Sequence, residues 1–291
     1  MPDCPPNAVL RFAPSPNGYL HLGHALSALI CQQWADALGG HLLLRIEDTD
    51  LSRARPNFVD AIHEDLAWLG IRFDGPTRVQ SQHLGLYDEA LRSLYQRGFA
   101  YPAPASRKEM ADAVTAYETD GRSWPRDPDG SPHYPFRDRD LAARPERMPD
   151  EQPIRLNMEA ACKARSRTKL TVQTMETPHA DPVAQPLDPS LWGDVLLRGR
   201  DRPATYHLAV VVDDAAQRVT HVVRGKDLEA ATSLHRLLQE LMDLPAPIYH
   251  HHHLVMGEDG RKLSKSEGAK SLRVMREAGE TPADIRRHLM D

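Results

Sequence analysis

The sequence predicts an α/β protein built on a parallel sheet, and three segments support this prediction. A short strand at 9–12 breaks through a Pro-Asn-Gly turn and runs into a helix with apolar residues at helical spacing. The mostly apolar run at 41–46 is typical of a buried parallel strand. The segment 219–228 is the clearest strand in the second half of the chain, and a helical pattern follows it.

Helices are expected between these strands. The stretches 58–69 and 87–96 carry apolar residues at helical spacing, and glycine follows each of them closely. From residue 101 to about residue 153 the chain is polar and rich in proline, which is too long for a simple loop in a compact domain. We therefore expect an inserted subdomain there, with a helix at 108–117 and a strand at 154–158 on its far side.

Composition limits the class of protein. No apolar run is long enough to span a bilayer, and the N-terminus lacks a basic stretch followed by an apolar one, so a cytoplasmic protein without membrane contact is expected. Cys4, Cys31 and Cys162 suit neither a disulfide framework nor a Cys-x-x-Cys metal site. Because the net charge is −5, any nucleic-acid contact must be made by local basic patches.

The first strand–turn–helix unit carries a candidate anion site. His21, Gly23 and His24 lie where the helix is expected to begin. Free backbone N–H groups and the helix dipole attract anions at such a position. The two imidazoles could donate hydrogen bonds to phosphoryl oxygens, and Gly23 would let a nucleotide approach the backbone closely. The alternative is an ordinary turn with incidental histidines.

Two motifs at opposite ends of the chain carry a family resemblance. His21-Leu22-Gly23-His24 resembles the His-x-Gly-His signature of class I aminoacyl-tRNA synthetases, and the segment 11–21 before it is similar to the glutamyl branch. Arg261-Lys262-Leu263-Ser264-Lys265-Ser266 is similar to the Lys-Met-Ser-Lys-Ser loop of that class. The resemblance implies a Rossmann-type class I synthetase catalytic domain with an inserted α/β subdomain and a C-terminal KMSKS-type, stem-contacting segment.

The resemblance also implies a division of the chain into domains. Residues 1–100 and 191–245 would form the two halves of the Rossmann catalytic domain, and 101–190 the inserted, tRNA-contacting subdomain. Residues 246–291 would hold the Lys-Leu-Ser-Lys-Ser loop and a short helical segment, with no anticodon-binding domain.

ATP would bind between the two motifs. By resemblance His21, His24, Lys262 and Lys265 are the catalytic residues, because cationic or hydrogen-bonding groups must meet the charge that develops on the phosphates. The expected ATP-binding residues are His21, Gly23, His24, Asp227, Lys262, Leu263, Ser264, Lys265 and Ser266. Mg²⁺ is expected to travel with ATP, and the sequence shows no all-protein cage for it.

A glutamate pocket is the second implication. An acidic substrate calls for a guanidinium, and the resemblance assigns the pocket to Arg11, Ala13, Ser15, Glu47, Tyr206 and Arg224. Glu47 would take the α-ammonium group and Tyr206 would close the pocket. As an alternative, each arginine could pair with a neighbouring aspartate.

The insertion departs from the family pattern. Many glutamyl-queuosine synthetases hold zinc there through cysteines, and Ala103, Ala105 and Phe136 occupy those positions here. Methyl and phenyl groups cannot replace thiolates at a tetrahedral zinc site, so no structural zinc is expected.

The family branch that the chain resembles is that of the glutamyl-queuosine tRNA(Asp) synthetases. This resemblance implies ATP-dependent activation of L-glutamate and its transfer to the queuosine base at the wobble position of the tRNA(Asp) anticodon. The expected partners are L-glutamate, ATP and the queuosine-containing anticodon stem-loop, bound by a monomer.

Three other functions stay open or are disfavoured. A core-only glutamyl-tRNA synthetase could charge tRNA(Glu), and an amino-acid ligase could use a non-RNA acceptor. A non-catalytic adaptor is disfavoured because His21, His24, Lys262 and Lys265 are all retained. The four consecutive histidines at 250–253 could bind a metal, but we favour a strand whose alternate histidines face opposite sides.

Overall fold

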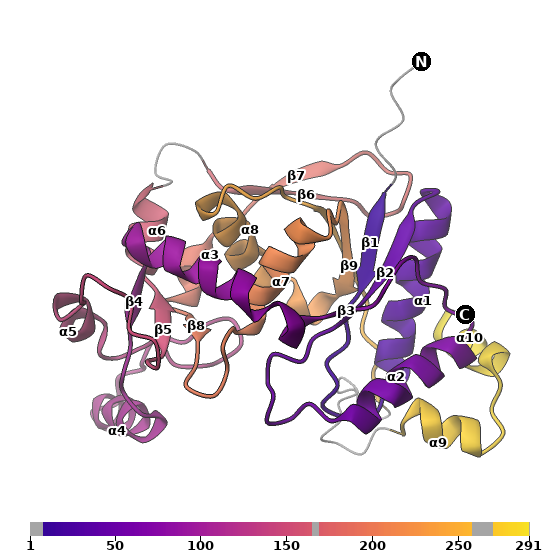
Figure 1. Cartoon of the computed structure of the whole chain (residues 1–291), viewed down its shortest axis with the longest axis horizontal. Helices are drawn as coiled ribbons and strands as arrows, with labels where there is room; N and C mark the ends of the chain where they lie inside the picture. The colour runs from indigo at the N-terminus through magenta and orange to yellow at the C-terminus, as the bar shows by residue number, and fades with distance from the viewer. Residues whose placement is uncertain (1–7, 165–168, 258–269, 291) are drawn as a thin grey trace.

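The computed structural model describes residues 8–164, 169–257 and 270–290, and it confirms the predicted α/β fold (Figure 1). Three strands pair in parallel in the order β1-β2-β3: β1 (Val9–Phe12), β2 (His41–Ile46) and β3 (Arg78–Val79). A second ladder has the order β7-β6-β10-β9: β6 (Thr171–Thr174), β7 (Val183–Pro186), β9 (His221–Gly225) and β10 (Ile248–His252). In this second ladder β9, β10 and β6 are parallel, and β7 is antiparallel to β6.

The two ladders meet where β1 lies beside β9. The backbone N–H of Thr220 donates to the Val9 carbonyl at 2.9 Å, and the Val9 N–H donates to the Thr220 hydroxyl at 2.8 Å. The strand order is therefore β3-β2-β1-β9-β10, in which successive strands run outward from β1 on one side and from β9 on the other. Ligands of open α/β sheets bind at such a reversal, beyond the carboxyl ends of the strands.

Helices cover the sheet as the apolar spacing predicts. The five longest near the sheet are α1 (Leu22–Ala37), α2 (Pro56–Trp68), α3 (Leu84–Gln96), α7 (Tyr206–Ala216) and α8 (Ala231–Leu241). Leu26, Leu29 and Ile30 of α1 are buried in the core beside β1 and β2. The return from α1 to β2 needs glycine at position 40, because a Cβ there would meet the Ala8 carbonyl oxygen at 2.2 Å.

Short helices complete the core. The chain ends with α9 (Leu272–Glu277) and α10 (Pro282–Met290), which lie near α2 and α1 in Figure 1. Ile285 and Leu289 of α10 join the same hydrophobic cluster as α1. Single 3₁₀ turns are η1 (Gln80–His83), η2 (Pro189–Trp192) and η3 (Lys226–Leu228). No helix in the described ranges is long and apolar enough to cross a membrane.

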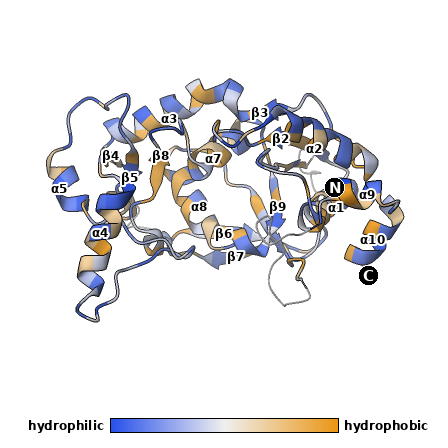
Figure 2. Cartoon of the chain, turned by 90° about the horizontal axis from the view of Figure 1, so that it is seen from below, coloured by the Kyte–Doolittle hydropathy of each residue, from blue (hydrophilic) through white to orange (hydrophobic). Residues whose placement is uncertain are grey.

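The inserted region contains its own antiparallel sheet. Its strands have the order β4-β5-β8: β4 (Ala100–Pro102), β5 (Ile154–Leu156) and β8 (Leu196–Arg198). Around it lie α4 (Arg107–Glu118), α5 (Arg137–Ala142) and α6 (Met158–Ala164). In Figure 2, α5 is mostly hydrophilic at one end of the molecule, whereas α8, near the middle, is amphipathic and buries four leucines. The prediction placed β6 and β7 in the insertion, but β6 pairs with β10 and β7 pairs with β6. The domain division itself stays a prediction.

The three positions aligned with zinc ligands come together in a small apolar cluster. Ala103 is buried, and Ala105 and Phe136 pack against the same cluster as Tyr134. The guanidinium of Arg139 stacks over the Phe136 ring at 4.4 Å. These methyl and phenyl groups offer no ligand atom to a metal ion, and the absence of zinc stays a prediction.

Candidate active site

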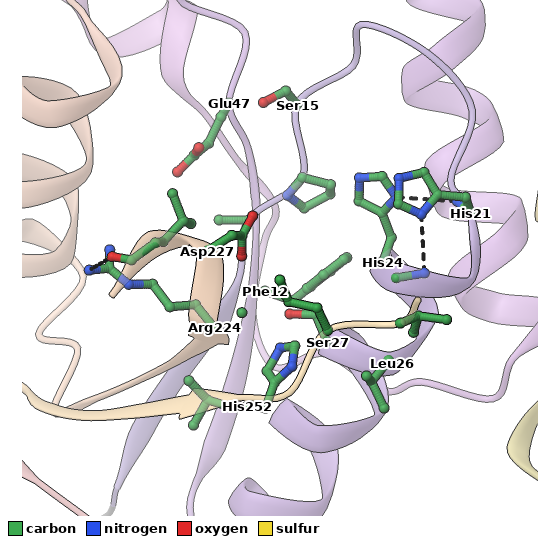
Figure 3. A pocket seen from close by; sticks show the side chains of 18 of the residues that line it. Phe12, Ser15, His21, His24, Leu26, Ser27, Glu47, Arg224, Asp227 and His252 are labelled. Atoms are coloured by element: carbon green, nitrogen blue, oxygen red, sulfur yellow. Dashed lines mark hydrogen bonds between the residues drawn. The ribbon is translucent and has the colours of Figure 1, made fainter. Parts of the chain in front are cut away.

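A cavity of about 420 Å³ lies at the carboxyl ends of β1 and β9, where the strand order reverses (Figure 3). All the predicted site residues that the structure describes line it: Arg11, Ala13, Ser15, His21, Gly23, His24, Glu47, Tyr206, Arg224 and Asp227. The predicted residues Lys262, Leu263, Ser264, Lys265 and Ser266 lie outside the described residues. The structure thus brings together groups that are up to 216 positions apart in the sequence.

The two histidines form the N-terminal cap of α1. His21 Nδ1 accepts a hydrogen bond from the Gly23 N–H at 3.1 Å, and His24 Nδ1 accepts one from the His21 N–H at 3.2 Å. A neutral imidazole that accepts at Nδ1 carries its proton on Nε2, so each ring presents an N–H donor. A larger residue at position 23 would press on the cap, because its Cβ would lie 3.0 Å from His21 Cε1 and the ring would have to shift.

The two predicted pocket arginines have different electrostatic surroundings. Arg11 pairs with the buried carboxylate of Asp214, with Nε and Oδ1 3.0 Å apart, as the alternative interpretation expected for this residue. Arg45 shares that carboxylate at 2.6 Å. Burial opposes ionisation of Asp214, but the two guanidinium groups outweigh it and lower the pKa of Asp214. The charge of Arg11 is therefore already balanced within the protein.

Arg224 has no carboxylate within ion-pair distance in the described part of the chain. Its guanidinium donates instead to neutral acceptors: His235 Nδ1 at 3.1 Å, the Thr232 hydroxyl at 2.8 Å and the Leu228 carbonyl at 3.0 Å. Arg224 is only 4% exposed. A buried cation held by neutral groups at a cavity wall could pair with an anionic ligand.

A chain of neutral histidines orients Arg224. Because a guanidinium only donates, His235 must accept at Nδ1 and carry its proton on Nε2, which donates to His207 Nδ1 at 3.1 Å. Burial, reinforced by the charge of Arg224, lowers the pKa of His235 well below its usual value and that of His207 to about 4. Both rings are therefore neutral at physiological pH and add no charge next to Arg224.

Glu47 is the acidic counterpart of Arg224. It follows β2, and its backbone N–H donates to the Pro14 carbonyl at 3.0 Å. Burial raises the pKa of the Glu47 carboxyl to about 7, against the opposing effect of Arg45 and Arg11. Its Oε1 atom has no hydrogen-bond donor among the described residues, and the nearest cationic atom, Arg45 Nη1, is 3.8 Å away. Glu47 lines the cavity, and its carboxylate could accept a hydrogen bond from a ligand ammonium group.

The residues that support the pocket arginines from the side away from the cavity were not predicted from the sequence. Asp213 and Asp214 interrupt an otherwise apolar helical segment, and both are buried. Buried carboxylates require partners, so this pair was a readable signal of an ion network behind the pocket. The positions of His207 and His235 carried no comparable signal, because their contact joins two helices through tertiary packing.

Comparisons with known proteins show the family to which the chain belongs. The family model described as "tRNA synthetases class I (E and Q), catalytic domain" matches residues 7–290. The chain is 43% identical to a "Glutamyl-Q tRNA(Asp) synthetase" of Rhodobacter capsulatus, over 96% of this chain and 98% of that protein. It is 35% identical to a "Glutamate--tRNA ligase" of Synechococcus sp., over 96% of this chain and 57% of that protein. A crystal structure of a glutamate tRNA ligase from Elizabethkingia meningosepticum in complex with its amino acid is similar at a TM-score of 0.69 and 28% identity, covering 90% of this chain and 53% of that one.

Proposed function

The chain belongs to the class I tRNA synthetases of the E and Q branch, and from this premise we propose that it is a glutamyl-queuosine tRNA(Asp) synthetase. It would activate L-glutamate with ATP and transfer the glutamyl group to the queuosine base at the wobble position of tRNA(Asp). One observation carries the substrate class: Arg224, a buried cation with no carboxylate partner in the described ranges, lies in the same cavity as Glu47. The Rhodobacter capsulatus relative, matched over almost its whole length, supports the acceptor.

The pocket suits both charged ends of an amino acid. Arg224 would receive a carboxylate of glutamate, and Tyr206, whose hydroxyl accepts from Arg224 Nη1 at 3.4 Å, would close the pocket over it. Glu47 would receive the α-ammonium group. The charge of Arg11 is balanced by Asp214, so Arg11 would contribute N–H groups and part of the pocket wall. Ala13 and Ser15 would form the adjoining wall.

Activation joins the α-carboxylate of glutamate to the α-phosphorus of ATP and expels pyrophosphate. His21 and His24 would donate their Nε2–H groups to phosphoryl oxygens, where negative charge increases in the transition state. Lys262 and Lys265 are proposed to neutralise the leaving pyrophosphate. The acceptor hydroxyl then attacks the glutamyl carbonyl, and AMP leaves.

Family membership implies ATP with Mg²⁺. No group of three or more His, Cys, Asp or Glu side chains in the described ranges could hold a metal ion by itself. In nucleotide-binding enzymes Mg²⁺ is usually bound chiefly through the phosphate oxygens of the nucleotide.

A second cavity of about 200 Å³ offers an approach for the acceptor. It shares Ser15, Glu47 and Tyr206 with the first cavity, and the ion pair between Asp50 and Arg202 lines its other side. We place the acceptor nucleoside on this side, where its hydroxyl could reach a glutamyl group held next to Glu47 and Tyr206.

The deciding experiment is transfer of radiolabelled glutamate, in the presence of ATP and Mg²⁺, to three RNAs. These are tRNA(Asp) with queuosine, the same tRNA with unmodified guanosine, and tRNA(Glu). We expect label on the first RNA alone. Label on tRNA(Glu) would identify a core-only glutamyl-tRNA synthetase, and glutamate-dependent ATP–pyrophosphate exchange without any RNA labelling would identify a different acceptor.

Glutamate binding is expected to weaken below pH 7. Only the ionised Glu47 carboxylate attracts an ammonium group, and its pKa is about 7. Protons therefore compete with glutamate below that pH, so affinity should fall about tenfold per pH unit there and stay constant above it. Calorimetric titration of glutamate between pH 5.5 and 8.5 measures this. Glu47→Gln should bind weakly and lose the dependence, whereas a wild-type affinity that is unchanged from pH 8 to pH 6 would contradict the assignment.

A further inference from the structure

His252 is the last residue of β10, and its ring lies on the wall of the active-site cavity beside Ser27 (Figure 3). The side chain is buried, with 4% of the residue exposed. Its Nδ1 atom lies 2.7 Å from the His253 carbonyl oxygen. A carbonyl oxygen only accepts, so Nδ1 carries the proton, and Nε2 of the neutral ring is left as an acceptor.

No described residue donates a hydrogen bond to this acceptor. His252 Nε2 is a buried polar atom without a hydrogen-bond partner in the described ranges. Burying an acceptor unpaired is unfavourable, so native structures rarely keep one unless a water or ligand supplies the donor. Because the ring lines the cavity, that donor would come from whatever the cavity binds.

The position of His252 indicates which part of a ligand it meets. The charged amino-acid end of the cavity lies at Arg224 and Glu47, and the phosphate end at His21 and His24. Leu26, Val223, Leu254 and Val255 supply apolar lining to this cavity, and Ser27, His253 and Asp227 supply polar lining. Apolar surface together with the oriented His252 acceptor suits a flat heteroaromatic ring with an amino group on its edge.

We propose that His252 is a base-recognition residue whose Nε2 accepts a hydrogen bond from the exocyclic 6-amino group of adenine. The inference rests on the proposed use of ATP in this cavity. Purines with a 6-oxo group would place a second acceptor against Nε2 and leave both atoms unpaired. His252 would thereby select adenine over guanine and hypoxanthine nucleotides.

The test compares nucleotide binding by the wild type and by His252→Leu. Calorimetry would use ATP, purine riboside triphosphate (which lacks the 6-amino group), inosine triphosphate (6-oxo) and 2′-deoxy-ATP. For the wild type we expect about tenfold tighter binding of ATP than of purine riboside triphosphate, since one neutral hydrogen bond is lost. His252→Leu should bind ATP about tenfold more weakly and no longer distinguish these two nucleotides.

Two further variants test whether the preference for ATP comes from the acceptor atom of the His252 side chain. His252→Gln keeps an acceptor in the side chain and should restore part of the preference for ATP. His250→Leu makes the same change two residues earlier on the same face of β10, where His250 stacks on Trp34 at 4.5 Å outside the cavity lining, and should leave the preference unchanged.

The outcomes separate this inference from the proposed function. If His252→Leu keeps the wild-type ratio between ATP and purine riboside triphosphate, or loses only discrimination against 2′-deoxy-ATP, the inference is overturned; absence of ATP binding to the wild type also overturns it. If base discrimination depends on His252 but no nucleotide supports glutamate-dependent pyrophosphate exchange, the inference stands and the proposed function fails.

Discussion

Arg224→Gln is expected to lower kcat/KM for glutamate in ATP–pyrophosphate exchange about a thousandfold, or about 4 kcal/mol of transition-state binding. The glutamine amide can still donate a hydrogen bond, but it carries no charge. A substrate carboxylate would then be buried without its cation, because Arg11 is already paired with Asp214. The loss should reside mainly in KM for glutamate, and KM for ATP should change little.

The same substitution should not weaken the fold. Arg224 is a buried cation whose charge no described carboxylate balances, so its removal relieves an electrostatic penalty in the free protein that offsets the lost hydrogen bonds to His235, Thr232 and Leu228. We expect the thermal midpoint of the ligand-free variant to equal or exceed that of the wild type. Arg287→Gln, an exposed arginine of α10 paired with Asp284, serves as the matched control and should leave both kinetics and midpoint unchanged. If kcat/KM for glutamate of Arg224→Gln lies within threefold of the wild-type value, Arg224 does not bind the substrate carboxylate.

Asp214→Asn is expected to destabilise the protein by about 3–5 kcal/mol, because it removes one partner from a buried ion network. Arg11 and Arg45 both depend on this carboxylate, and Arg45 is fully buried. Urea unfolding monitored by tryptophan fluorescence measures the change in free energy of unfolding. Asp138→Asn makes the same change in an aspartate whose side chain is 94% exposed and paired with Arg137, and should have almost no effect. A loss below 1 kcal/mol at Asp214 would show that Arg11 and Arg45 find other partners.

Local pattern was enough to predict most of the fold near the site. The predicted helices at 58–69 and 87–96 correspond to α2 (Pro56–Trp68) and α3 (Leu84–Gln96). The predicted strand at 219–228 is shorter in the structure, because residues 226–228 form the 3₁₀ turn η3. The pairing of β6 with β10 was not predictable, since it joins segments about 75 residues apart through their sheet edges rather than through any local signal.

For the four histidines at 250–253, too, the local pattern predicts the strand but not its tertiary contacts. The expectation of a strand with alternating faces is confirmed, because His250 stacks on Trp34 of α1 whereas His251 Nε2 lies 3.0 Å from the Thr232 hydroxyl beside Arg224. Strand periodicity alone gives these opposite directions. It could not give the position of His252 on the cavity wall, which depends on tertiary packing.

The contact between β1 and β9 has a consequence during synthesis on the ribosome. The chain is made from its N-terminus, so β1 emerges about 200 residues before the strand that lies beside it. Until β9 follows, the inner edge of β1 has no neighbour, and an unpaired strand edge can associate with other chains. Arg11 and Arg224 reach a common cavity only when both halves have left the ribosome, so a nascent chain has no substrate pocket that could stabilise it. Chaperone protection of the growing chain would therefore be needed most over this interval.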